Sequence, residues 1–267
     1  MNKTIKQTIM IEKSDNGVST IVLNQPQKHN ALSPIMIEEL SETFDQFKKD
    51  NNTRVLIISA KGKSFCAGGD LDWMKEQIFS DRKTRIKEAG KLADLLYKMH
   101  EFPKPLLAKV EGNAFGGGIG IISVCDIAIS LENIKLALTE AKLGLIPATI
   151  SPYVISKIGS NNAIDLFTSA RTFSSVEAKK IGLIKSFCKN EDIDDIIYEE
   201  VNSFLMNAPS AVSASKKLVR DLSVKIDEET IKFTVEALAD VWENPEAIDG
   251  INAFFEKRKP SWLMEKK

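Results

Sequence analysis

The chain has 267 residues and a mass of 29.6 kDa, which corresponds to one large domain or one and a half ordinary ones. Its 36 basic and 37 acidic residues nearly cancel, and a formal charge of −1 gives no support for nucleic acid as the main partner. No apolar run has the length of a signal-peptide core or of a bilayer span, so we expect a cytoplasmic protein with no membrane partner.

The cysteines and histidines are few and isolated. Cys66, Cys125 and Cys188 form no CxxC pair, so we expect three reduced, structural thiols. His29 and His100 are too few for a zinc site or a histidine-based triad. The sequence therefore predicts no metal site.

The first elements in chain order are two strands separated by a helix. β-Branched runs at 18–23 (VSTIVL) and 54–60 (RVLIISA) predict the strands. Between them, Ser33 followed by Pro34 is typical of a helix start. The apolar residues that follow at helical spacing are Ile35, Met36, Leu40, Phe44 and Phe47. They predict an amphipathic helix of about four turns.

The same alternation continues along the chain. Residues 105–112 (PLLAKVEG) predict a strand, the glycines after it open a helical run at 118–125, and 126–131 and 134–139 predict two more strands. Strands interleave with helices through the first 190 or so residues, as in an α/β protein.

Beyond residue 190 the pattern becomes purely helical. Amphipathic runs occupy 193–208, 210–222 and 227–243. We therefore divide the chain into a core at 1–190 and a helical region at 191–267. The apolar stripes of these helices require a partner, which is either the core or another subunit.

Two glycine loops, at 62–70 and 112–120, stand out between strands and helices. Neither is a phosphate loop, because Ile57 stands where a Walker motif needs its first glycine and the second loop never satisfies GxGxxG. Each loop follows a strand and opens a helix, where backbone N–H groups without helical partners suit an oxyanion. A tight turn or close helix–strand packing is the alternative for each.

Five motifs together resemble the enoyl-CoA hydratase/isomerase (crotonase) family. They are NQPQKHNALS at 24–33, GKSFCAGGDLDWM at 62–74, VEGNAFGGGIGIISVCDIAIS at 110–130, LTEAKLGLIP at 138–147 and AFFEKRKPSW at 253–262. The resemblance implies an α/β crotonase (ClpP-like) spiral of repeated ββα units with a C-terminal helical trimerisation region. It also implies a homotrimer or dimer of trimers, and no cofactor other than the coenzyme A carried by the substrate.

The resemblance also assigns roles to residues of this chain. The backbone N–H groups of Gly69 and Gly117 would bind the thioester oxygen of an acyl-CoA, and Glu140 would be the catalytic acid–base. A coenzyme A turn at residues 28–32, a groove at 64–67 and two C-terminal contacts would hold the substrate, although the lysines among them could be ordinary solvated charges. The implied substrate-binding residues are Lys28, Asn30, Ala31, Leu32, Ser64, Phe65, Ala67, Gly68, Asp70, Leu71, Gly116, Gly120, Phe255 and Lys257.

Glu140 can be interpreted in two ways. By itself, it could be a helix-start glutamate that the macrodipole favours. Its apolar flanks, Leu138, Ala141 and Leu143, would instead raise the carboxyl pKa toward the range useful in acid–base catalysis. The resemblance favours the catalytic interpretation.

Gly120 departs from the family pattern, because hydratases of the family usually carry a glutamate there. Three reactions stay open: hydration with Glu140 moving both protons through one water, a double-bond shift by one base, and a non-redox lyase reaction through the same enolate. A non-catalytic acyl-CoA-binding relative and an RNA-binding role of residues 215–220 (SKKLVR) are further alternatives.

The stretch Ile150-Ser151-Pro152 also departs from many relatives, which carry a glycine pair there. With Gly120 and GDLDWMK, it resembles the bacterial branch that acts on branched, carboxylated enoyl-CoAs such as 3-methylglutaconyl-CoA. A second glutamate would repel a substrate carboxylate, so our hypothesis is that Gly120 removes that charge and opens room. Lys142, close by in the sequence, is better explained as a solvated surface charge.

Overall fold

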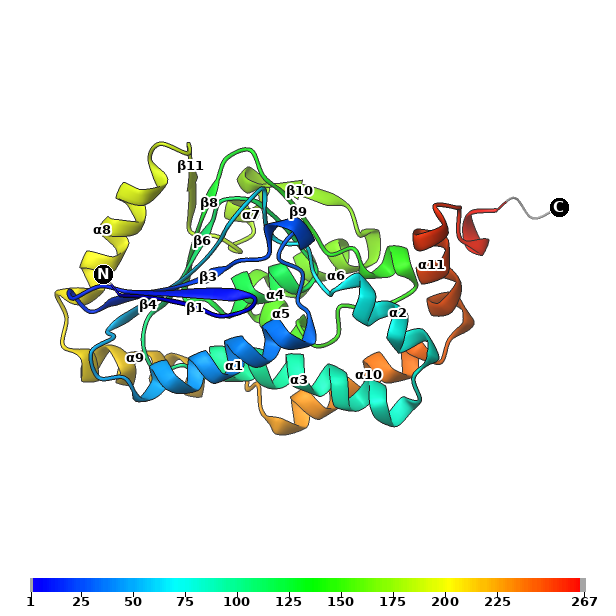
Figure 1. Ribbon diagram of the computed structural model, residues 1–267, viewed down its shortest axis with the longest axis horizontal. Coiled ribbons are helices and arrows are strands. Elements are labelled where there is room, and N and C mark those ends of the chain that lie inside the picture. Colours follow the sequence, from blue (N-terminus) through cyan, green and yellow to red (C-terminus); the bar gives the residue numbers. More distant parts are fainter. Residues whose placement is uncertain (1, 265–267) are drawn as a thin grey trace.

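The computed structural model describes residues 2–264 and contains two sheets (Figure 1). The larger sheet has the strand order β1-β2-β3-β4-β6-β8-β11, and its strands from β3 to β11 pair in parallel. Its strands are β1 (Asn2–Ile5), β2 (Ile9–Lys13), β3 (Val18–Leu23), β4 (Val55–Ala60), β6 (Leu106–Val110), β8 (Ile127–Leu131) and β11 (Ser186–Cys188). The smaller sheet has the order β10-β9-β7-β5, with β5 (Ser64–Cys66), β7 (Asn113–Phe115), β9 (Lys135–Ala137) and β10 (Thr172–Ser174).

The chain visits the two sheets in turn, which produces a spiral. β4, β6 and β8 of the larger sheet are followed directly by β5, β7 and β9 of the smaller one, and a helical segment comes next. Neighbouring parallel strands need such crossover connections, because no tight turn can join them. The repeated ββα unit of the crotonase fold is thereby confirmed.

The first helix begins where the sequence places a cap. Ser33 accepts a hydrogen bond from the Met36 N–H at 3.3 Å and starts α1, which confirms the helix expected after that residue. The helices of the core are α1 (Pro34–Lys49), α2 (Leu71–Phe79), α3 (Arg82–His100), α4 (Gly117–Val124), α5 (Ser151–Ile158), α6 (Ser160–Ser169) and α7 (Ser175–Lys180). The later ones are α8 (Ile193–Leu205), α9 (Pro209–Leu222), α10 (Glu228–Trp242) and α11 (Pro245–Glu256), and short 3-10 turns lie at Pro26–Lys28, Glu140–Leu143 and Ser261–Leu263.

The larger sheet is covered on both faces. Alternate residues of β4 point to opposite sides, so Val55 and Ile57 pack with α8 while Leu56 and Ile58 enter the main core. Figure 1 shows α1, α3 and α10 together along one side of the molecule, and α8 and α11 at opposite ends. Both faces of β4 are therefore apolar, which explains why its sequence is a continuous hydrophobic run.

Several elements differ from the expectation, and besides those described next, the strands β5, β10 and β11 and the helices α3, α6 and α7 were not predicted. The hairpin of β1 and β2 and the helix α11 were not predicted, and the strand expected at 105–112 is two strands, β6 and β7, in different sheets. The break falls at Gly112, where a Cβ would lie 2.6 Å from the Lys63 carbonyl oxygen. Only glycine allows the backbone to approach β5 so closely as it changes sheets.

The C-terminal helices pack on the core of the same chain. The buried Arg85 side chain of α3 donates hydrogen bonds to the Trp242 carbonyl at 3.3 Å and to Glu243 Oε1 at 2.7 Å, both near the end of α10. These contacts show that α10 packs on the core of its own chain, which is one of the two partners expected for the C-terminal helices. The division into parts at 1–190 and 191–267 stays a prediction.

The basic run in α9 is engaged within the chain. Lys216 donates to Asp126 Oδ2 at 2.7 Å, Arg220 donates to the His100 carbonyl at 3.1 Å, and Lys217 pairs with Asp221. Each of these three cations is therefore paired within the chain. Within residues 2–264, no helix has both the length and the apolar character that a membrane span needs.

Candidate active site

Loop 112–118 delivers Gly116 and Gly117 to the start of α4. Gly116 has φ 46° and ψ −114°, a conformation that side chains disfavour, and its N–H donates to the Ala137 carbonyl at 3.0 Å. Gly117 is the first residue of α4, so its N–H has no acceptor one turn earlier in the helix. Among residues 2–264 no other acceptor takes this N–H.

Loop 67–70 carries the second glycine pair. Gly68 has φ 95°, and its carbonyl accepts the Leu32 N–H at 2.7 Å. Asp70 caps α2, because its carboxylate accepts the N–H groups of Asp72 at 3.0 Å and Trp73 at 3.1 Å. Within the described chain the N–H of Gly69, between these two residues, donates to no protein acceptor.

The two glycine loops meet. A Cβ built on Gly68 would lie 3.8 Å from the Gly117 nitrogen, and one built on Gly116 would lie 3.8 Å from the Gly68 Cα. Two unpartnered backbone N–H groups, of Gly69 and Gly117, thus belong to loops in van der Waals contact. Preorganised backbone donors of this kind are the type of group that binds an anionic oxygen.

Glu140 lies against the same junction, at the start of the 3-10 turn Glu140–Leu143. A Cβ on Gly116 would lie 2.7 Å from Glu140 Oε1, so a side chain at 116 would displace the carboxyl from its present position. Glu140 Oε2 is buried and has no hydrogen-bond partner among residues 2–264, although the residue as a whole is partly exposed. Burial raises the pKa of this carboxyl to about 7. The direction is the one that the apolar flanks in the sequence predict.

The predicted coenzyme A turn is held by Asn30, whose side chain is fully buried. Asn30 Oδ1 accepts the Gln25 N–H at 2.8 Å, and its Nδ2 donates to the carbonyls of Lys61 and Ser64, both at 2.8 Å. In the free protein Asn30 is therefore a structural tie between loops 24–32 and 61–64. Lys28 is about half exposed and pairs with Asp72 at 3.1 Å and Asp70 at 3.5 Å.

We expect Asn30→Ala to lower the free energy of unfolding by about 2 kcal/mol, because three backbone groups, one buried and two partly buried, lose their partner. Urea denaturation followed by circular dichroism measures the change. Asn133→Ala, at an exposed position whose amide contacts only Glu132, serves as the control. An unchanged midpoint for Asn30→Ala would contradict the structural role.

Some of the remaining predicted residues lie at the glycine loops, and the others lie elsewhere. Leu32 approaches the glycine junction, since its Cδ1 would be 2.7 Å from a Cβ on Gly117, and Ala31, Ser64, Ala67 and Leu71 flank these loops in the chain. The Phe65 side chain is fully buried in the core, so only its backbone could line a groove. Phe255 instead packs against α2, with Lys75 Nζ 4.2 Å from its ring centroid. Lys257 ends α11 with φ 53°, and its ammonium pairs with no carboxylate of residues 2–264.

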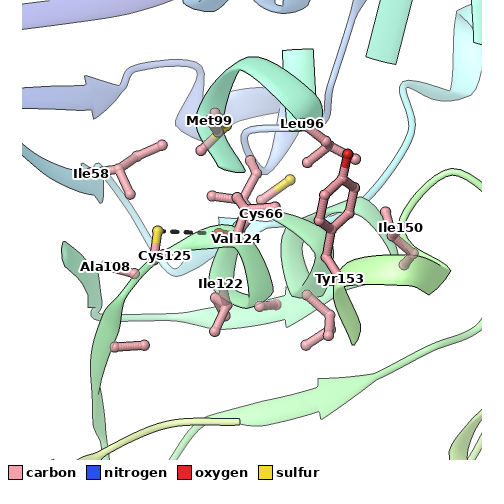
Figure 2. Close-up of a cluster of buried hydrophobic side chains, with 14 of the residues drawn as sticks. Ile58, Cys66, Leu96, Met99, Ala108, Ile122, Val124, Cys125, Ile150 and Tyr153 are labelled. Carbon is pink, nitrogen blue, oxygen red and sulfur yellow. Dashed lines mark hydrogen bonds between the residues drawn. The ribbon is translucent and has the colours of Figure 1, made fainter. Parts of the chain in front are cut away.

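Gly120 does not open room, which corrects that part of the hypothesis. A Cβ on Gly120 would lie 3.0 Å from the Ile150 Cβ and would overlap its Cγ2. Figure 2 shows Ile150 with Tyr153 and Leu96 in the buried cluster around α4. The sequence signal for this contact was the pair of departures at 120 and 150, which were interpreted together as a mark of one family branch and not as a contact between the two residues.

The cysteines lie in apolar surroundings and none is bonded to another. Burial raises the pKa of the Cys66 thiol to about 12 and also raises that of Cys125. Cys125 Sγ donates to the Ile121 carbonyl in the cluster of Figure 2. Structural, reduced thiols fit this environment. Within residues 2–264, no three histidine, cysteine or acidic side chains are placed to hold a metal ion.

A cavity of about 640 Å³ lies at the other end of α4, away from Glu140. It is lined by Tyr153, Lys157, Lys216 and neighbouring residues of α3, α5 and α9. Lys157 Nζ donates to the Cys125 carbonyl at 2.7 Å and to the Asp126 carbonyl at 3.2 Å. This lysine therefore stabilises the C-terminus of α4, where the helix dipole favours a cation.

The spiral fold and the paired glycine loops beside a buried carboxyl define an enzyme of the crotonase class. The chain matches the family model described as enoyl-CoA hydratase/isomerase over residues 13–265, and it belongs to that family.

Relatives agree over nearly the whole chain. The enoyl-CoA hydratase EchA19 of Mycobacterium tuberculosis is 30% identical over 243 residues, covering 91% of each chain. A solved enoyl-CoA hydratase from Shewanella pealeana is 36% identical, with a TM-score of 0.79 and 96% of each chain covered. An enoyl-CoA hydratase from Mycobacterium avium is 27% identical, with a TM-score of 0.84, and the match covers 97% of this chain and 100% of the other.

Proposed function

We propose that the protein is an enoyl-CoA hydratase, a hydro-lyase that adds water across the 2,3 double bond of an enoyl-CoA. The observation that carries the proposal is Glu140, whose Oε1 lies against the junction of the two glycine loops. A carboxyl with a pKa near 7 can take and return a proton at neutral pH. Coenzyme A arrives with the substrate, and the reaction needs no other cofactor because the thioester itself stabilises charge at its oxygen.

The proposed reaction passes through an enolate. The Glu140 carboxylate takes a proton from water as the water oxygen bonds to C3, and the double-bond electrons move onto the thioester oxygen. The N–H groups of Gly69 and Gly117 hold this oxyanion, and each such donor typically contributes a factor of about 10² to 10³ in rate. Protonated Glu140 then returns its proton to C2, so water is added in full and the glutamate is regenerated.

For the substrate we propose a branched enoyl-CoA that carries its own carboxylate, such as 3-methylglutaconyl-CoA, an intermediate of leucine degradation. Position 120 offers no carboxylate, so the substrate would meet one fewer negative charge than in a two-glutamate site. Straight-chain enoyl-CoAs of fatty acid metabolism are the substrates with which the carboxylated one should be compared. Among residues 2–264 we assign no cationic side chain as the partner of the substrate carboxylate.

We further propose a cytoplasmic homotrimer or dimer of trimers. The feature that supports self-association is the apolar surface of α9, where Leu218, Val219 and Leu222 are all exposed. Exposed apolar side chains gathered on one helix are typical of an interface.

A double-bond isomerase is the second candidate. Its support is that Gly120 leaves Glu140 without a second carboxyl on α4, and a shift of the double bond requires only one base. Such an enzyme would take a proton from C2 of a 3-enoyl-CoA and deliver it to C4.

Loss of the conjugated enoyl-thioester absorbance tests the proposal, with crotonyl-CoA and 3-methylglutaconyl-CoA as separate substrates. We expect the absorbance to fall with both and faster with the carboxylated one. If neither changes but a 3-enoyl-CoA gains absorbance, the protein is an isomerase. If nothing changes with any of the three and acyl-CoA still binds, the protein is a non-catalytic relative.

A further inference from the structure

The turn that carries Glu140 is short and lies against α11. It is a single 3-10 turn, Glu140–Leu143, and it ends at Gly144 with φ 71°. Within it, the Leu145 N–H donates to the Glu140 carbonyl at 3.0 Å, and the Gly144 N–H donates to the Ala141 carbonyl at 3.2 Å. The hydrogen bonds of a 3-10 turn have poorer geometry than those of an α-helix. The place of Glu140 therefore depends on what packs against this turn.

α11 meets the turn backbone to backbone, and each side of the contact carries a glycine. A Cβ on Gly250 of α11 would lie 2.5 Å from the Leu143 carbonyl oxygen. A Cβ on Gly144 would lie 2.5 Å from the Glu246 carbonyl oxygen. Both distances are far shorter than the separation of about 3.5 Å at which non-bonded atoms attract each other. A side chain at either position would therefore push the two backbones apart.

α11 is itself fixed at both ends. Asn244 caps its start, because its side chain accepts the Glu246 N–H at 3.0 Å. Near its end, Asp249 accepts the Ser261 N–H at 2.6 Å and pairs with Arg258 at 2.8 Å. These contacts tie the last described turn of the chain to the helix. The helix that contacts the turn of Glu140 is therefore held in place.

α11 also packs against the helix that follows Gly69. Ile251 is buried together with Met74 of α2 in a cluster that also contains Leu145. The Met74 side chain would lie 3.9 Å from a Cβ on Gly69. Figure 1 shows α11 at one end of the molecule, next to α2. One helix thus contacts both the turn of Glu140 and the helix beside an oxyanion donor.

We propose that α11 holds the turn of Glu140 in position and that Gly250 is the positioning residue through which it does so. This inference deepens the proposed function and rests on it, because Glu140 moves the proton there. Since Gly250 has no side chain, the Leu143 carbonyl lies directly against the helix, which fixes the distance between the Glu140 carboxyl and the glycine junction. A displacement of about 1 Å at a reacting group can lower a rate on the order of 10²-fold.

The kinetic test compares two Gly→Ala changes within helices. Gly250→Ala adds a methyl group against the turn, whereas Gly90→Ala in α3 meets no atom of another element within 4 Å in the described chain. With crotonyl-CoA, and where circular dichroism shows both variants folded, we expect Gly250→Ala to lower kcat about tenfold or more and to keep KM within about threefold. Gly90→Ala should keep wild-type values. An unchanged kcat in Gly250→Ala would overturn the proposal.

A further variant identifies the contact that matters. Trp262 Cη2 would lie 2.7 Å from the same Cβ on Gly250, so the methyl group could act through the indole ring. Trp262→Leu removes this overlap and leaves the overlap with Leu143. We expect Gly250→Ala to lower kcat by the same factor in the Trp262→Leu background. If the loss disappears in that background, the effect lies in the C-terminal turn and the positioning role is refuted.

A double-mutant cycle on stability does not depend on any reaction. Because Glu140 is buried, Glu140→Gln should raise the midpoint of urea unfolding at pH 8. A displaced turn would let water reach the carboxylate and reduce this gain. We expect the gain to fall to half or less in the Gly250→Ala background and to stay complete in the Gly90→Ala background. Equal gains in the two backgrounds would contradict the proposal.

Hydrogen exchange provides a test that does not require Gly250→Ala to fold. Asn244→Ala removes the cap of α11, a mild change at an exposed position. We expect the amides of Gly144 and Leu145 to exchange faster together with those of α11, and the exposed control Asn133→Ala to change neither set. Faster exchange confined to α11 would overturn the proposal.

The failure of this inference and that of the proposed function can be told apart. If wild type acts on no enoyl-CoA, the proposed function fails, and the stability cycle and the exchange rates still decide whether α11 holds the turn. If wild type is active and Gly250→Ala equals it in kcat, the proposed function stands and the positioning role of Gly250 falls.

Discussion

Glu140→Gln is expected to lower kcat by about 10³, because the amide cannot accept a proton from water or return one to carbon. Glutamine has the same shape as glutamate, so KM and acyl-CoA binding should change little. Stopped assays with a purified enoyl-CoA, combined with calorimetric binding of a saturated acyl-CoA, separate the two effects. Glu132→Gln, at an exposed position in a turn, is the matched control and should retain wild-type rates.

The pH profile strengthens this test. The carboxylate is the form that takes the first proton, and burial sets its pKa at about 7 in the free enzyme. The wild-type kcat/KM should therefore rise with pH through about 7 and level off above it. Residual activity of Glu140→Gln should lack this rise. A variant that keeps more than a tenth of wild-type activity, or a wild-type rate that is flat between pH 5 and 8, would show that another group is the base.

Much of the spiral core is predictable from local patterns. The strands at 18–23 and near 54–60 and the helix after Ser33 follow from β-branched runs and a clear N-cap, and the structure has them at those places. The hairpin of β1 and β2 was not predicted, because β1 is exposed along its length and carries no apolar alternation. α11 escaped because Gly250 interrupts a short apolar pattern, although the glycine is required there. A Cβ at 250 would lie 2.5 Å from the Leu143 carbonyl oxygen.

The candidate site shows a different limit. The two glycine loops and Glu140 could be named from the sequence, because glycine clusters after strands have a physical purpose and the family motifs fix their order. That Gly116 faces the glutamate and Gly120 faces Ile150 depends on contacts between α4 and segments 20 to 30 residues further along the chain. The spacing of apolar residues along the sequence carries no information about such contacts. The hypothesis of open room at Gly120 was wrong for this reason.

The Glu140 carboxyl should lower the free energy of unfolding at high pH, and Glu140→Gln should remove this effect. The pKa of Glu140 is raised from 4.5 to about 7 on folding, so the folded state holds a proton more tightly than the unfolded state. Its contribution to stability is fully present below pH 4.5 and is lost as the pH rises through 7.

From this difference, the glutamine variant should exceed wild type in free energy of unfolding by about 3 kcal/mol at pH 8 and by less than about 1 kcal/mol at pH 5. Urea denaturation at the two pH values measures both numbers, and Glu132→Gln should show no such divergence. A variant no more stable than wild type at pH 8 would mean that the folded protein solvates the Glu140 carboxylate, and the acid–base role would then lack its physical basis. A variant that gains stability as it loses activity would show that the Glu140 carboxylate lowers the free energy of unfolding and is retained for catalysis.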